Sequence, residues 1–187
     1  MFYSATTNGF YDTNLHSWLP DDAVEITEER HQELLALQSS GYEIIDSGDG
    51  TPTTRPSAPD DFHKWNGSAW VADSTKKQEA ITKAEAKIDE ATHTAILNGF
   101  SHGGHSFHMT EIRQFNHHVN FGLRDFLTYP YPVKSNDGYL DIANADDYAT
   151  FFLAGATHKE TAIRNGQAQK DALPAMTTAE IIAFINS

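Results

Sequence analysis

The alternation of hydrophobic and polar positions predicts a small strand–helix–strand module over residues 1–46. Aromatic residues at positions 2–3 begin the first strand, and Thr27 is a suitable N-cap for a helix with one apolar face. Gly41 is placed to end this helix in the left-handed conformation that glycine tolerates. A β-branched strand follows over residues 42–45, so we expect the helix to pack against two short strands.

Residues 47–73 are predicted to form a Pro/Gly-rich linker that ends in a hairpin. Between residues 47 and 61 the chain has several Gly and Pro residues and almost no large apolar side chain, which is typical of a linker. Asn66–Gly67 then lies between Trp65 and Trp70. Asn-Gly is a strong hairpin signal, because both residues tolerate a positive φ angle.

Residues 74–98 carry the most regular helical pattern of the chain. Ile81, Ile88 and Ala95 recur every seven residues, and charged side chains occupy the other faces. The run is short for a coiled coil. We therefore predict a solvated connecting helix with one packed stripe, and we keep self-association through the 74–98 helix as the alternative.

Residues 99–187 are predicted to form a larger module with a core of its own. Gly103–Gly104 indicates a hairpin, and two more strands are expected over residues 131–142. Thr110, Asn144 and Thr177 are suitable N-caps for three helices. The first of these helices has a continuous apolar face, which consists of Ile112, Phe115, Val119, Leu123 and Phe126. The fold class predicted for the whole chain is α+β.

Composition narrows the possible functions. The formal net charge of −13 disfavours binding to nucleic acid or to anionic membranes through a broad basic face. Cysteine is absent, which excludes disulfides, thiolate nucleophiles and Cys-ligated zinc. We expect neither a signal peptide nor a membrane span, because the apolar runs are short and no basic n-region precedes them.

Histidine is the one enriched residue type that could bind a metal. Among the ten His residues, His102, His105 and His108 are the candidate ligands, but their spacing matches neither H-E-x-x-H nor another metal motif. The sequence also lacks a nucleophile elbow, a P-loop and a dinucleotide-binding loop. We therefore predict no metal, no cofactor and no enzymatic activity.

The two Trp residues of the hairpin suggest a second kind of site. Exposed aromatic rings can stack on sugars, so Trp65 and Trp70 are candidates for glycan binding. The alternative is that both rings close a small core, since Trp is usually largely buried.

The first module resembles bacteriophage tail fibre assembly proteins. The resemblance rests on Phe2–Ser4, Asn8–Asp12 and Pro20–Thr27, followed by the helix that ends at Gly41, and the Trp hairpin is also similar to linkers in that family. The C-terminal module resembles an uncharacterised domain found in many phage tail proteins.

The resemblance implies a chaperone that binds the C-terminal tip of a trimeric tail fibre and aids its folding or trimerisation. Such proteins act in the cytoplasm of the infected bacterium, and some stay bound in the virion tail. The implied partner is a tail fibre protein. The alternative function that we keep is a structural tail or fibre-tip subunit that binds host surface glycan. The resemblance supplies no contact residues. We choose the N-terminal aromatic residues as candidates, which are Tyr3, Phe10, Tyr11 and Trp18.

Overall fold

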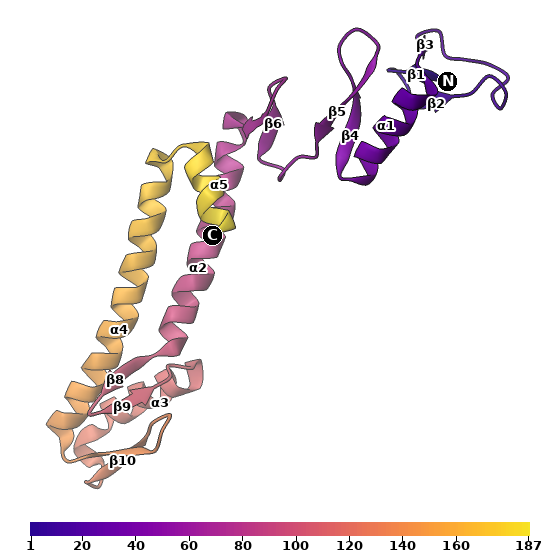
Figure 1. Ribbon diagram of the computed structural model, residues 1–187. Helices are drawn as coiled ribbons and strands as arrows, with labels where there is room; N and C mark the ends of the chain where they lie inside the picture. The colour runs from indigo at the N-terminus through magenta and orange to yellow at the C-terminus, as the bar shows by residue number, and fades with distance from the viewer. The chain divides into compact units, whose positions relative to one another are not determined.

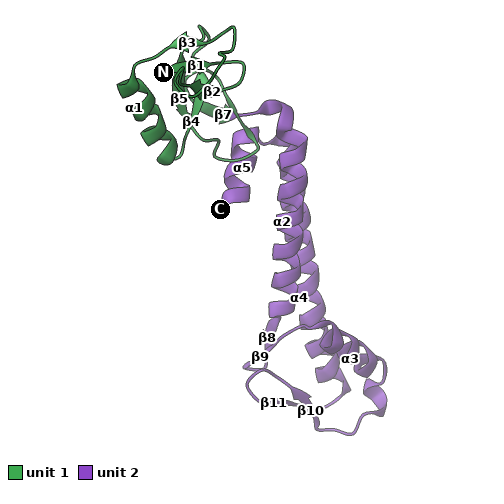
Figure 2. Ribbon diagram, turned by 90° about the vertical axis from the view of Figure 1, so that its right-hand side faces the viewer, with its two compact units in different colours: residues 1–71 green, residues 72–187 purple.

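Short antiparallel strand pairs and five α-helices make up the protein, as a computed structural model of residues 1–187 shows (Figure 1). The predicted α+β class is therefore confirmed. The chain divides into unit 1, residues 1–71, and unit 2, residues 72–187 (Figure 2).

Unit 1 combines a three-stranded sheet, one helix and two hairpins. Its elements are β1 (Phe2–Ser4), β2 (Gly9–Tyr11), β3 (Val24–Glu25), α1 (Glu28–Ser39), β4 (Tyr42–Asp46), β5 (Pro52–Pro56), β6 (His63–Trp65) and β7 (Trp70–Ala72), the last of which ends at the unit boundary. The sheet has the order β2-β1-β3, so β2 and β3 are its edge strands. Tyr3, Leu34 and Ile44 are buried together and form the core between β1, α1 and β4.

The predicted caps of α1 are confirmed. The Thr27 side chain accepts a hydrogen bond from the Arg30 amide, and Gly41 has a φ angle of +90° just beyond the end of the helix. The prediction of a structureless linker over residues 47–61 is wrong in part, because residues 52–56 form β5. This strand pairs with β4 from Tyr42 opposite Pro56 to Asp46 opposite Pro52.

The predicted Trp hairpin is confirmed as the β6–β7 pair, although its turn differs from the expected two-residue form. The turn runs from Asn66 to Ala69, and the Asn66 amide donates to the Ala69 carbonyl. Of the two predicted turn residues, Gly67 has a positive φ angle, +103°, and Asn66 does not. The Asn66 side chain accepts hydrogen bonds from the amides of Ser68 and Ala69. Asn66 thus stabilises the turn through its side chain.

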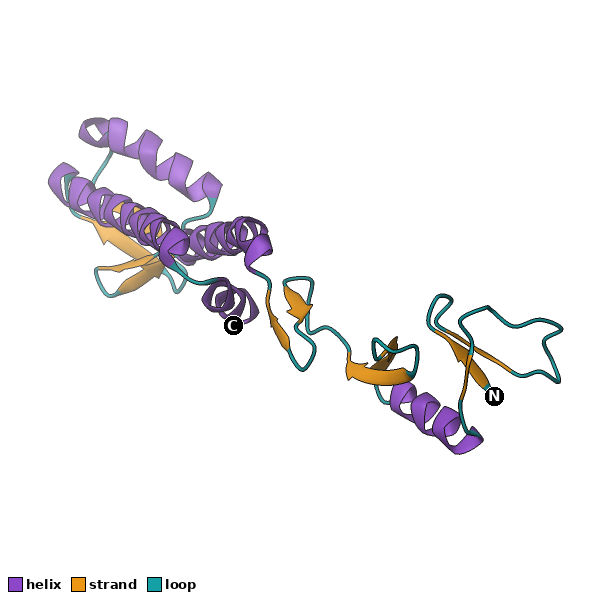
Figure 3. Cartoon of the chain, turned by 90° about the horizontal axis from the view of Figure 1, so that it is seen from above, coloured by secondary structure: helices purple, strands orange, loops and turns teal.

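Unit 2 is mainly helical (Figure 3), and its strands form two hairpins near one end of the long helices (Figure 2). Its α-helices and strands are α2 (Lys77–Asn98), β8 (Phe100–His102), β9 (His105–Phe107), α3 (Glu111–Gly122), β10 (Tyr131–Lys134), β11 (Tyr139–Ile142), α4 (Ala145–Ala172) and α5 (Thr178–Asn186). Short 3₁₀ helices cover Ser74–Lys76, Arg124–Phe126 and Leu173–Ala175. None of the helices combines the length and the apolarity that a membrane span requires.

The helix α2 packs antiparallel to α4 along most of its length (Figures 1 and 2). Lys170 of α4 pairs with Asp89 of α2 at 2.6 Å, and His158 Nε2 lies 3.0 Å from the Ala95 carbonyl oxygen. The helix α5 lies beside the first half of α2, where Lys87 Nζ donates to the Phe184 carbonyl at 2.9 Å.

The predicted packed stripe of residues 74–98 is covered within the chain over its first half. Ile81, Ala84 and Ile88 are buried, and α2 contacts both α4 and α5. This part of the stripe is therefore not free for the self-association that we considered for this helix.

One hydrophobic core cluster of unit 2 lies where α4 crosses the two hairpins. It consists of Phe107, Val133, Ile142, Tyr148 and Phe151. The hairpin turn predicted at Gly103–Gly104 is confirmed, because both residues have positive φ angles. The N-cap predicted at Thr177 is confirmed as well, since Thr177 makes a complete capping box at the start of α5.

The apolar face predicted for α3 lies outside this core. The five residues predicted for it, which we call the α3 stripe, are all exposed to solvent: Ile112, Phe115, Val119, Leu123 and Phe126. The structure places the last two beyond the end of α3, with Leu123 as its C-cap and Phe126 in the following 3₁₀ helix. The expectation that this face contributes to the core of the module is wrong. The side chains that α3 turns towards α4 are instead those of Gln114, His117 and Phe121.

Candidate partner-binding surfaces

A loop with exposed aromatic and aliphatic side chains follows the edge strand β2. We call residues 11–23 the aromatic loop. Its first turn forms around Asp12, whose carbonyl oxygen accepts hydrogen bonds from the amides of Leu15 and His16 at 2.9 and 2.8 Å. The Asp12 carboxylate also accepts from the Asn14 amide at 2.8 Å, which is a local Asx turn.

Asp22 holds the other end of the aromatic loop against β1. One carboxylate oxygen accepts from the Ser4 hydroxyl at 2.7 Å, and the other accepts from the Thr6 amide at 2.7 Å. These hydrogen bonds, chiefly that from the Thr6 amide, lower the pKa of Asp22. This anchoring role was not predicted from the sequence.

The side chains on this loop form a small exposed platform. The Tyr11 ring centre lies 5.2 Å from that of His16 and 6.0 Å from that of Trp18. Trp18 is 63% exposed and Leu15 is 81% exposed. Leu15 was not predicted, although a leucine within the polar run of residues 12–17 was a signal that could have indicated it. Trp and Tyr side chains are enriched at the hot spots of protein-binding surfaces.

The four N-terminal aromatic candidates do not form one surface. Tyr11 and Trp18 lie in the aromatic loop, whereas Tyr3 is fully buried and its hydroxyl donates to Asn8 Oδ1 at 2.8 Å. Phe10 is half-buried, with its ring 4.5 Å from the His31 ring. Tyr3 and Phe10 thus support the sheet, Tyr11 is half-buried like Phe10, and only Trp18 is largely exposed.

Trp65 and Trp70 pack against each other, with their ring centres 5.6 Å apart. Trp70 donates from Nε1 to the Pro56 carbonyl at 2.7 Å, and the Arg55 guanidinium lies 4.9 Å from its ring centre. Trp65 also lines a groove of about 530 Å³. Most of the other lining residues are polar or glycine: Asp46, Ser47, Gly48, Thr53, Thr54, Arg55 and Gly67, with Ile45 as the aliphatic member.

The candidate metal ligands of unit 2 point to separate partners. His105 Nδ1 lies 3.1 Å from Asp137 Oδ1, His108 Nδ1 lies 3.2 Å from the Asn98 carbonyl oxygen, and the His102 ring packs on Phe151. The chain has no group of three or more His, Asp or Glu side chains arranged to hold a metal ion.

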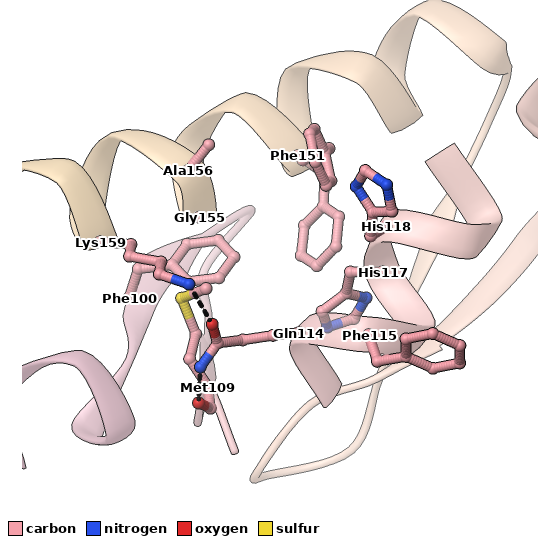
Figure 4. Close-up of a pocket in the computed structure, with 11 residues that line it drawn as sticks. Phe100, Met109, Gln114, Phe115, His117, His118, Phe151, Gly155, Ala156 and Lys159 are labelled. Atoms are coloured by element: carbon pink, nitrogen blue, oxygen red, sulfur yellow. Dashed lines mark hydrogen bonds between the residues drawn. The ribbon is translucent and has the colours of Figure 1, made fainter. Parts of the chain in front are cut away.

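A largely apolar pocket of about 340 Å³ lies between α3, α4 and the β8–β9 hairpin (Figure 4). Phe100, Phe115 and Phe151 contribute aromatic walls. At one end, Lys159 Nζ donates to Gln114 Oε1 at 2.8 Å, and Gln114 in turn donates to the Met109 carbonyl at 2.7 Å (Figure 4).

His117 occupies the α3 side of this pocket. Its ring lies 5.0 Å from that of Phe151, and Nε2 is buried without a hydrogen-bond partner. Burial, with a smaller contribution from Arg113, lowers the pKa of His117. The ring is therefore neutral at pH 7 and behaves as an aromatic packing residue between α3 and α4.

Comparison with known proteins supplies one informative similarity. No protein-family model matches the sequence, and no solved structure is significantly similar to it. The "Probable tail fiber assembly protein" of Shigella phage SfV is 38% identical over 100 residues, an alignment that covers 48% of this chain and 60% of the phage protein. The chain is thus similar, over about half of its length, to a phage protein named for tail fibre assembly.

Proposed function

We propose that this protein is a bacteriophage tail fibre assembly protein with a non-enzymatic role. The observation that carries the proposal is its 38% identity to the phage SfV protein of that name. In this role it acts as a chaperone in the cytoplasm of the infected bacterium. It binds the C-terminal tip of a trimeric fibre and aids the folding or trimerisation of that fibre. After assembly it either dissociates from the fibre or stays bound in the virion tail.

The geometry of unit 1 supports such a role. Before fibre chains trimerise, their strand edges and hydrophobic side chains are exposed and prone to aggregate. The edge strand β2 offers unpaired backbone groups, and the adjoining aromatic loop offers Leu15 and Trp18. We assign the fibre contact to this surface, with Tyr11 as the residue that links the strand to the loop.

Charge supports a protein partner with a neutral or basic surface. Residues 1–71 contain twelve acidic side chains and only three basic ones. Such a field repels phosphates and favours encounter with basic patches.

Co-expression with the fibre protein of the same phage tests the proposal. We expect the fibre to form trimers that resist dissociation in detergent only when this protein is present. The double variant Leu15→Ala/Trp18→Ala should abolish that effect without unfolding the protein. Leu153→Ala is the matched control, because Leu153 is also exposed, at 64%, but belongs to unit 2. A fibre that trimerises and is infective in the absence of this protein would overturn the proposal.

A fibre-tip subunit that binds host glycan is the second candidate. The groove beside Trp65 favours it, because an aromatic wall with carboxylate, hydroxyl and guanidinium groups suits sugar recognition. We expect Trp65→Ala to abolish binding of polysaccharide isolated from the host surface. Unchanged binding by Trp65→Ala, measured by calorimetry, would exclude this groove as the glycan site.

A further inference from the structure

The apolar pocket between α3, α4 and the β8–β9 hairpin has one wall that the core holds in place. Phe100 lies close against α4 at Gly155, where an added Cβ atom would lie only 3.0 Å from Phe100 Cε1. The Phe100 ring centre also lies 5.4 Å from that of Phe107 and 5.4 Å from that of Phe151, and both of these residues are buried in the core. This wall is therefore preformed, as is usual for ligand-binding sites.

The other walls come from α3 and α4, which contact each other through aromatic rings. The His117 ring centre lies 5.0 Å from that of Phe151, and the Phe121 ring stacks on Phe152 at 4.3 Å. None of the residues of α3 is fully buried. The volume of about 340 Å³ is near the lower end of the range for ligand pockets, about 300–1,000 Å³. The pocket thus has room for one small molecule, which would contact both helices at once.

One end of the pocket carries a positive charge that has no anionic partner. Lys159 Nζ donates to Gln114 Oε1, an uncharged acceptor, and the Gln114 amide is held in this orientation because it donates to the Met109 carbonyl (Figure 4). Lys170 of the same helix is paired with Asp89, whereas Lys159 has no carboxylate partner. An ammonium group has three donors, so two of those on Lys159 remain for an anion.

We propose that this pocket binds a small organic acid, with an aromatic ring or a short alkyl chain between the Phe side chains and the carboxylate on Lys159. Charge complementarity decides the class of ligand. A molecule with one apolar end and one anionic end matches both ends of the pocket, whereas Lys159 would repel a cation. A hydrogen bond from an ammonium group to a carboxylate is also roughly twice as strong as one between neutral groups. This site lies wholly within unit 2 and does not depend on a role in fibre assembly.

Titration with phenylpropionate and octanoate, followed by the amide NMR signals of the full chain at pH 7, tests the site. We expect saturable shifts for residues that line the pocket. Phenylpropanol has the same ring and chain without the charge, so it should bind about tenfold more weakly. Lys159→Met should weaken phenylpropionate by about tenfold and leave phenylpropanol unchanged. Lys170→Met removes the same charge elsewhere on α4 and should alter neither affinity.

A substitution that fills the pocket locates the ligand. Ala156 lines the pocket and is exposed to solvent, so Ala156→Trp can place its ring in the pocket without displacing the core. We expect this variant to lose binding of both acids. Leu153→Trp adds the same side chain at a position of α4 that is 64% exposed and outside the lining, and it should bind like the wild type. Circular dichroism shows whether each variant folds, and Lys159→Met decides the question if Ala156→Trp does not.

Three results would overturn the proposal. These are the absence of saturable shifts with either acid, equal affinities for phenylpropionate and phenylpropanol, and unchanged binding of phenylpropionate by Lys159→Met. A peptide that ends in phenylalanine serves as a further probe, because its terminal residue also combines an apolar group with a carboxylate. Binding of this peptide without binding of the free acids would assign the pocket to the end of a polypeptide and would refute a small acid as its ligand.

Discussion

Replacement of Gly166 by alanine tests the close approach of α2 and α4. A Cβ atom added at Gly166 would lie 3.3 Å from Thr92 Cβ and 3.4 Å from its Cγ2, and it would overlap Thr92 Oγ1. Overpacking of this kind typically costs about 1–3 kcal/mol. Alanine regains up to about 1 kcal/mol of helix propensity. We therefore expect Gly166→Ala to lower the free energy of unfolding of unit 2 by about 1–2 kcal/mol.

A double-mutant cycle identifies the cause of this loss. Thr92→Ala removes Oγ1 and Cγ2 of Thr92, which crowd the new Cβ, and leaves only the Thr92 Cβ nearby. In that background Gly166→Ala should therefore be neutral or stabilising. The resulting coupling energy is about 1–3 kcal/mol, which is the cost of the overpacking itself. Gly122→Ala is the control. Apart from its chain neighbours and the nearby backbone of its own helix, no heavy atom lies within 4 Å of the position where its Cβ would be. It should cause no loss of stability.

Urea denaturation followed by far-ultraviolet circular dichroism measures these changes. The signal reports mainly unit 2, which holds four of the five α-helices, whereas all three Trp residues lie in residues 1–71 and their fluorescence follows unit 1 separately. If Gly166→Ala causes the same loss in both backgrounds, the crowding by Thr92 is not its cause. If it causes no loss in the wild-type background, the two helices are further apart than described.

Three further outcomes follow from individual contacts. Leu34→Ala should destabilise unit 1 by about 2–5 kcal/mol, because Leu34 is fully buried, whereas Leu15→Ala should change stability by less than about 0.5 kcal/mol; urea denaturation compares them. Thr177→Ala removes the capping box of α5 and should cost about 1 kcal/mol in thermal denaturation of unit 2. Hydrogen bonds, chiefly from Ser47, lower the pKa of Asp49 to about 2, so its stabilising contribution is complete above its ordinary pKa of 3.8 and is lost as the pH falls towards 2. Carboxyl NMR titration should show this midpoint, and Ser47→Ala should raise it.

Local structure was predictable because its determinants are close in sequence. Thr110 and Thr177 accept hydrogen bonds from amides three residues further along, and Gly103–Gly104 supplies the positive φ angles of a two-residue turn. Such signals need no knowledge of the rest of the chain. The same holds for Gly41, whose conformation ends α1.

Pairing between segments could not be predicted in this way. The strand β5 has two prolines and polar residues, and only its register with β4 gives it a partner. The aromatic loop depends on hydrogen bonds from Ser4 and Thr6 to Asp22, across many residues of chain. Tyr3 and Trp18 are both aromatic residues of the first module, yet only the folded sheet decides that one is buried and the other exposed.

The sequence by itself determined that α3 is a helix with one continuous apolar face, because helical periodicity is a property of the order of residues. It could not determine what that face contacts. Only the tertiary structure decided that α4 binds the opposite side, through His117 and Phe121, and that the stripe is left exposed. The physical reason is that burial depends on which surfaces are complementary in three dimensions, and periodicity specifies a face without specifying its partner.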